Sequence, residues 1–180
     1  MGNYIYTIGR ELGSGGYTVA KLLAERLGIK LYDKELLAQA AKDSGFCEEI
    51  FENHDERPTN SFLYSLVMDT YTGGNYSAAP FLDMPLNHKV FLAQFDTIKK
   101  IASEESCVIV GRCADYALAS NPDCLSIFVH ADMDWRISRL SQKHNKTAKE
   151  AKDMINKTDK SRSSYYNYYT NKRWGDANSY

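Results

Sequence analysis

The sequence of 180 residues lacks several features that define other classes of protein. No apolar run approaches the roughly 18–20 residues that cross a bilayer, and the N-terminus has neither the charged nor the apolar region of a signal peptide. There is also almost no excess charge, because 22 Lys and Arg face 23 Asp and Glu, which argues against a general nucleic-acid binder. We therefore expect a cytoplasmic protein that binds neither membranes nor nucleic-acid polymers.

Paired cysteines and clustered histidines are missing as well. None of the cysteines forms a CxxC pair, and the four histidines are scattered without metal-ligand spacing. This pattern predicts reduced thiols and no metal site made by the protein alone. The cysteines are Cys47, Cys107, Cys113 and Cys124. The length fits one compact domain, at about 100–200 residues per domain.

The balance of charge conceals an uneven distribution along the chain. Residues 1–134 hold 11 basic and 19 acidic side chains, a net charge of −8, whereas residues 135–180 hold 11 and 4, a net charge of +7. One interpretation of the basic part is a solvated helical face. The other is a cationic flap that closes over an anionic ligand such as a polyphosphate.

Segments typical of strands alternate with segments typical of helices, which predicts an α/β domain with a mainly parallel sheet. In such sheets the ligand crevice lies beyond the carboxyl ends of the strands. The segments typical of strands are 4–8, 29–32, 107–110 and 125–129. The expected helices are one that ends at Gly28, two at about 34–44 and 89–103, one that carries Trp135, and polar segments to about 163, before a tyrosine-rich, turn-like tail. Residues 52–88 are irregular, which is typical of a functional or mobile segment.

A glycine-rich segment follows the first predicted strand. Four of the eight residues from Gly9 to Gly16 are glycine, and an amphipathic helix comes next. Such a turn can point successive backbone N–H groups at an anion, with the helix N-terminus adding a partial positive charge. Phosphate binding and a purely structural turn are the two interpretations.

The glycine segment departs from the Walker A pattern GxxxxGK[ST]. If Gly15 takes the last glycine position, Gly16 stands where the lysine belongs and Tyr17 where the magnesium-binding hydroxyl belongs. The lysine normally contacts the β- and γ-phosphates. Either another cation replaces it, or the protein binds a nucleotide without turning it over.

Four separated motifs resemble the bacterial cytidylate kinase-like family. They are Ile8–Gly16, Leu31–Leu36, Val108–Tyr116, and Tyr165–Thr170 with Trp174–Asp176. The resemblance implies a three-layer P-loop kinase fold in a single domain over 1–180, with a substrate-binding lobe over 34–104 and a lid over 133–173. It also implies that a further strand and helix should follow Tyr180.

The resemblance implies a nucleotide-dependent phosphotransferase. Its reaction would move the γ-phosphoryl group of ATP to CMP, dCMP or a related small acceptor, with ATP and Mg²⁺ as cofactors. One alternative is a non-catalytic nucleotide or phosphate sensor that retains the fold, which the missing lysine favours. Another is an oligomeric scaffold with a vestigial pocket, which would use the irregular 52–88 segment and the tyrosines.

The resemblance also implies roles for individual residues. The backbone N–H groups of Gly13, Ser14, Gly15, Gly16 and Tyr17 would hold phosphate, and Thr18 is a substitute hydroxyl for magnesium. Arg136 and Arg139 match the arginines of the lid helix, where one turn of spacing puts them on one face. A solvated face is the alternative for this pair.

Four residues would carry the chemistry: Arg10, Asp33, Arg112 and Arg162. Asp33 would lie beside the monophosphate site, unless it caps the helix that follows. Arg112 would grip a phosphate, unless it pairs with Asp115 or Glu11. The arginines, with Arg136, would together replace the missing lysine. The tyrosines of 165–169 would stack on a base, pack the lid against the core, or form a subunit interface.

Overall fold

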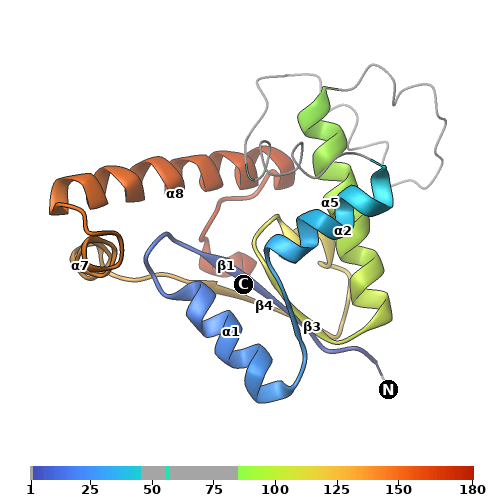
Figure 1. Ribbon diagram of the computed structural model, residues 1–180. Helices are drawn as coiled ribbons and strands as arrows, with labels where there is room; N and C mark the ends of the chain where they lie inside the picture. Colours follow the sequence, from blue (N-terminus) through green and yellow to red (C-terminus); the bar gives the residue numbers. More distant parts are fainter. Residues whose placement is uncertain (1, 46–55, 57–84) are drawn as a thin grey trace.

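The computed structural model describes residues 2–45, 56 and 85–180. Their strands form one parallel sheet in the order β2-β3-β1-β4 (Figure 1). The strands are β1 (Ile5–Arg10), β2 (Lys30–Tyr32), β3 (Cys107–Val110) and β4 (Cys124–Val129). The α/β prediction with a parallel sheet is therefore confirmed, with each strand within two residues of its predicted bounds.

The sheet is covered on both faces, because its central strands carry apolar residues on alternate sides. One cluster of buried residues includes Ile5, Ile98 and Ile109, and a second includes Ile8 and Val110. The helices that follow β1 and β2 are α1 (Gly16–Leu27) and α2 (Lys34–Ser44), and α5 (Leu86–Glu104) precedes β3. These layers place the carboxyl ends of β1, β2 and β3 at one edge of the core.

The basic part of the chain folds into two helices that pack against each other. They are α7 (Met133–His144) and α8 (Ala148–Thr170), preceded by the short α6 (Ala114–Ala117) and followed by a 3₁₀ turn, η2 (Ala177–Ser179). Thr147 and Glu150 form a reciprocal capping box that starts α8. Figure 1 shows α8 as a long helix that runs from α7 toward α5.

The prediction of a turn-like tyrosine tail after about residue 163 was wrong, because α8 continues to Thr170. Tyr165, Tyr166 and Tyr169 are buried on this helix, and the ring of Tyr169 stacks on Phe91 of α5 with centroids 4.0 Å apart. Their spacing of three and four residues is helical, and burial of aromatic surface stabilises the last turns. Packing of α8 against the core is thus the structural role of these three tyrosines.

Several smaller expectations have a structural outcome. Cys107, Cys113 and Cys124 are free thiols, while Cys47 lies outside the described residues. Most of the irregular 52–88 segment also lies outside them, with the exception of Glu56 and the residues from 85 onward. Among the described helices, none combines the length and apolar character of a membrane span.

Candidate functional site

The glycine loop joins β1 to α1 and has a conformation that requires glycine. Gly13 and Gly15 have φ values of 83° and 90°, in the left-handed region, and Gly15 is the N-cap of α1. The Ser14 hydroxyl donates to the Glu11 carbonyl at 2.9 Å, which closes the turn. The first backbone N–H groups of α1 lack partners within the helix and can bind an anion.

A cavity of about 230 Å³ lies over this loop. Besides the loop itself, its walls include four cationic side chains, one histidine and two carboxylates. They are Arg10, Arg139, Lys143, Arg162, His144, Glu11 and Asp33. Positive charge beside a helix N-terminus favours a polyanionic ligand.

Arg10 fills the place that a lysine side chain would need. A Cβ atom added at Gly16 would collide with Cβ of Arg10 and would lie 3.4 Å from Cβ of Val129. Because Cβ of Arg10 is fixed to the backbone of β1, it cannot move aside cheaply. The missing Walker lysine is therefore a packing requirement of this loop, and Arg10 supplies a cation at the same edge of the cavity.

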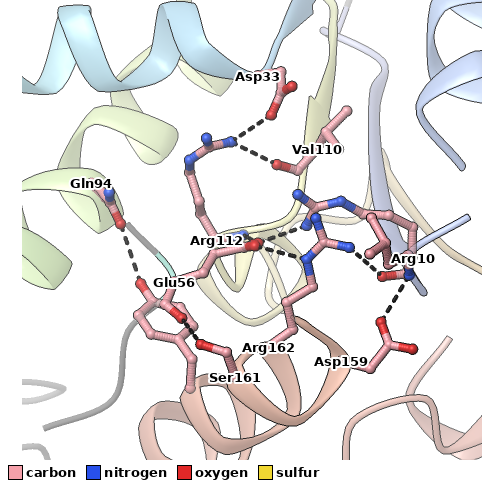
Figure 2. Close-up of polar contacts among 11 residues, drawn as sticks. Arg10, Asp33, Glu56, Gln94, Val110, Arg112, Asp159, Ser161 and Arg162 are labelled. Atoms are coloured by element: carbon pink, nitrogen blue, oxygen red, sulfur yellow. Dashed lines mark hydrogen bonds and ion pairs between the residues drawn. The ribbon is translucent and has the colours of Figure 1, made fainter. Parts of the chain in front are cut away.

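Two arginines converge on one carboxylate next to the cavity (Figure 2). Arg10 Nη1 donates to Glu56 Oε1 at 2.6 Å, and Arg162 Nε donates to Glu56 Oε2 at 3.1 Å. All three side chains are largely buried, with 12–16% of their surfaces exposed. The Ser161 hydroxyl also donates to the Glu56 carbonyl at 3.1 Å, so α8 holds this residue through both side chain and backbone.

The cluster keeps Glu56 ionised. Burial alone would raise the pKa of the Glu56 carboxyl, but the charges of the neighbouring arginines outweigh it and hold that pKa well below its usual range. Burial, with the nearby charge of Arg10, lowers the pKa of Arg162, and the carboxylate of Glu56 opposes that shift. A buried group of two arginines thus depends on an anion beside it.

The lowered pKa of Glu56 predicts how stability depends on pH. A carboxyl whose pKa is lower in the folded state stabilises the fold above its unfolded value of about 4.3, and this contribution is lost as the pH falls further. We expect Glu56→Gln to be less stable than the wild type by about 1–3 kcal/mol at neutral pH. The difference should shrink as the pH falls below about 4.3.

Urea unfolding of both proteins from neutral to acidic pH measures this difference. Carboxyl groups common to both proteins cancel in the comparison. If the difference in free energy of unfolding between the wild type and Glu56→Gln stays constant across the acidic range, the Glu56 carboxylate does not stabilise the fold through its ion pairs.

Arg112 lies at the end of β3 and faces Asp33 at the end of β2. Its Nη1 donates to Asp33 Oδ1 at 3.0 Å and to the Val110 carbonyl at 2.9 Å, and 2% of the side chain is exposed. Among the residues that the structure describes, Arg112 pairs with Asp33 and not with Asp115 or Glu11, and the Asp33 side chain makes no capping hydrogen bond to the described helix α2.

The backbone around Arg112 is strained. Gly111, Arg112 and Cys113 have successive φ values of 74°, 54° and 56°, all left-handed, although two of them carry side chains. Such conformations persist where surrounding contacts enforce them, and they concentrate at functional sites. Here the strain turns the backbone N–H of Arg112 toward Glu56 Oε1, at 3.4 Å.

Arg136 and Arg139 have different environments despite their spacing. Arg136 is buried, paired with Glu11 at 3.1 Å and with Asp159, and its Nε donates to the Leu12 carbonyl at 2.8 Å. Arg139 instead borders the cavity, donates to the Thr18 hydroxyl at 3.1 Å and stacks over Trp135. Arg136 thus ties the glycine loop to α7 and α8, and Arg139 is the one of the pair that faces the cavity.

Sequence reasoning missed three residues of this region, Glu56, Lys143 and His144, whereas the resemblance places Asp159 beside Arg162 in the lid. Lys143 follows Arg139 by four residues, so helical spacing could have placed both on one face. Asp159 receives the backbone N–H of Leu12 at 2.8 Å as well as Arg136. No sequence pattern around Glu56 indicates a functional residue, because Glu56 lies in the irregular segment. Its described contacts with the site are to residues far away in the sequence.

Among the described residues, the other predicted site residues come together at one edge of the sheet. Gly13, Gly15, Gly16, Tyr17 and Thr18 border the cavity. Asp33, Arg10 and Arg162 border it as well. Ser14 closes the loop from within, and Arg112 reaches the same edge through Asp33.

A parallel sheet in the order β2-β3-β1-β4, with a glycine loop after β1 and helices on both faces, is consistent with a P-loop kinase-like α/β fold. The chain belongs to the cytidylate kinase-like family, whose sequence profile matches residues 5–180. This agrees with the resemblance that the four sequence motifs carry.

Two solved structures are similar to the chain. The chain is 34% identical to an uncharacterized protein from Eubacterium ventriosum ATCC 27560, with a TM-score of 0.71 over 99% of this chain and 84% of that one. It is 17% identical to TT1252 from Thermus thermophilus, over 88% of this chain and 81% of that one, with a TM-score of 0.45. No curated protein sequence matches it significantly.

Proposed function

We propose that this protein is a nucleotide-dependent phosphotransferase that moves the γ-phosphoryl group of ATP to CMP, dCMP or a related small acceptor. The observation that carries the proposal is the meeting of the glycine loop with Arg10 and Arg162 at one cavity. Phosphoryl transfer needs positioning and neutralisation of charge more than a covalent catalyst. Two buried arginines beside a phosphate-binding loop supply both.

The donor side of the site is assigned to the glycine loop. Its left-handed glycines and the N–H groups of the first turn of α1, which have no partner within the helix, suit the phosphates of ATP, and Arg10 and Arg139 would neutralise them. Bound Mg²⁺ would supply further neutralisation of phosphate charge. Asp33 is the carboxylate we assign to it, since its pair with Arg112 uses one carboxylate oxygen and leaves the other for the metal, whereas the one oxygen of the Thr18 hydroxyl already accepts from Arg139.

The acceptor side is assigned to the ends of β2 and β3. The Asp33–Arg112 ion pair would orient the acceptor. Arg162, which lies on α8, would contact the phosphoryl group during its transfer. We extend this to the surrounding segments, with 34–104 as the substrate-binding lobe and 133–173 as the lid. The net charge of +7 over residues 135–180 supports a lid that meets a polyanion.

A non-catalytic nucleotide or phosphate sensor is the second candidate. The observation that favours it is the packing of Arg10 against Gly16, which excludes a lysine from the loop. A sensor would need the loop and the cavity but not Arg162. The two candidates therefore differ in turnover and share nucleotide binding.

Formation of ADP from ATP and Mg²⁺, measured across a panel of nucleoside monophosphates, separates the candidates. We expect acceptor-dependent ADP, highest with CMP or dCMP. Thermal unfolding with ATP, with and without Mg²⁺, shows whether nucleotide binds at all. Stabilisation by ATP without ADP formation for any acceptor would favour the sensor. If ATP neither stabilises the protein nor is converted to ADP, both candidates are contradicted.

A further inference from the structure

Glu56 occupies a set of hydrogen-bond donors that suits a phosphate group. Its Oε1 accepts from Arg10 Nη1 at 2.6 Å and from the backbone N–H of Arg112 at 3.4 Å, and its Oε2 accepts from Arg162 Nε at 3.1 Å. Two guanidinium groups and a backbone N–H turned outward by a strained strand end form a typical oxyanion site. A carboxylate of the protein fills it in this structure.

The space around the carboxylate leaves no room for a second anion. A Cβ atom added at Gly111 would collide with both Arg10 Nη1 and Glu56 Oε1, so the ion pair lies directly against the backbone of the strand end. The cavity that remains among these residues is about 20 Å³. A volume of that size holds about one water molecule, so a phosphate can take the positions of the two carboxylate oxygens, between Arg10, Arg162 and the Arg112 N–H, only in place of Glu56.

The backbone of Glu56 is itself in a disfavoured conformation. Its φ of 48° is left-handed, which is costly for a residue with a side chain. The arginines therefore hold Glu56 against a local preference. Replacement of the carboxylate by another anion would keep the arginines satisfied and relieve that strain.

We propose that Glu56 is an internal anion that occupies the acceptor-phosphate subsite, and that the dianionic phosphate of the acceptor displaces it to bind the same donors. A phosphate offers more acceptor oxygens and more charge than a carboxylate, so the exchange selects for phosphorylated substrates over carboxylates. Naming the acceptor as the source of the phosphate rests on the proposed function. The competition between Glu56 and an anion does not.

Calorimetric binding of inorganic phosphate tests the competition. We expect Glu56→Gln to bind phosphate about tenfold more tightly than the wild type, because it no longer offers a charged competitor to the arginines. Glu25→Gln is the matched control: it removes the same charge from a surface pair with Lys21, with 58% of the Glu25 side chain exposed. The affinity of this control for phosphate should stay within about twofold of the wild type.

Equal or weaker phosphate binding by Glu56→Gln would overturn the proposal and would make Glu56 a residue that orients the arginines. Glu56→Asp keeps the negative charge on a side chain that is one methylene shorter, so its carboxylate should compete less well for the arginines. Its affinity for phosphate should lie between those of the wild type and Glu56→Gln. If Glu56→Gln is too unstable for calorimetry, added phosphate should raise its Tm by more than that of the wild type, and an equal or smaller rise overturns the proposal. Because no readout requires turnover, a protein that binds phosphate but makes no ADP would contradict the proposed function alone.

Discussion

Replacement of Arg162 by alanine is expected to lower the rate of phosphoryl transfer about a thousandfold or more, since an arginine at the transferring group is worth on the order of 10³–10⁵ in kcat. Arg162 borders the cavity, its Nε is bound to Glu56, and its Nη1 points to the Arg10 carbonyl at 3.5 Å. In the proposed reaction Arg10 and Arg162 would carry most of the neutralisation, because no lysine stands in the glycine loop. Arg10 cannot replace Arg162 after its loss, since the two guanidinium groups lie at different positions, as their bonds to different oxygens of Glu56 show.

The Arg162→Ala variant should fold, with a loss of about 1–3 kcal/mol from the weakened cluster. Glu56 keeps its contacts to Arg10 and to the backbone of Arg112. The kcat of the variant should therefore be measured well below its Tm. Adding Glu56→Gln to Arg162→Ala should lower the stability further, because the buried Arg10 then loses its carboxylate partner, and it should restore none of the rate.

Arg26→Ala is the matched control for this experiment. Arg26 is exposed in the last turn of α1 and outside the cavity, so its loss changes the net charge equally without touching the site. Its kcat should equal that of the wild type. Near-normal transfer by Arg162→Ala would remove the lid arginine from the mechanism and favour a sensor.

The position of Glu56 shows the limit of prediction from this sequence. The strands and helices follow from local periodicity, and the ends of parallel strands predict that Arg10, Arg112 and Asp33 meet at one edge. Glu56 reaches that edge through partners 46 and 106 residues away, in a segment without periodicity. Only the assembled fold can pair it with two arginines from different elements.

Arg136 shows a second limit, which concerns helix faces. A spacing of three residues turns the side chain by about 60° around a helix, so Arg136 and Arg139 share a face only loosely. Packing of α7 against α8 covers the first, where Glu11 and Asp159 bind it, and leaves the second at the cavity. The tyrosine-rich end of α8 is similar, because contacts with α5, not local propensity, continue that helix to Thr170.

A methyl group at position 111 is expected to break the Arg10–Glu56 pair and to lower phosphoryl transfer about a hundredfold, the loss typical of a misplacement of about 1 Å. The added atom would meet Arg10 Nη1 and Glu56 Oε1, which are the ends of flexible side chains, so the ion pair gives way and the backbone stays. The φ of 74° adds strain of about 1–2 kcal/mol for any residue with a Cβ atom.

Gly28→Ala separates strain from steric conflict. Gly28 has a similar φ of 65°, and no atom of the described residues lies within 4 Å of the Cβ that alanine would add. Urea unfolding should therefore show a loss of about 1–2 kcal/mol for Gly28→Ala, from strain alone. Gly111→Ala should lose about 1–3 kcal/mol more, from the charged hydrogen bond.

A double-mutant cycle then assigns the extra loss to one contact. If the methyl group acts by breaking the Arg10–Glu56 pair, Gly111→Ala should cost less in a Glu56→Gln background, where that charged pair is already gone, so the two changes should not be additive. Gly28→Ala lies in a different turn and should cost the same in both backgrounds. Additive losses for Gly111→Ala and Glu56→Gln would mean that the strand end and the arginine cluster are independent, and the glycine at position 111 would then serve its backbone conformation alone.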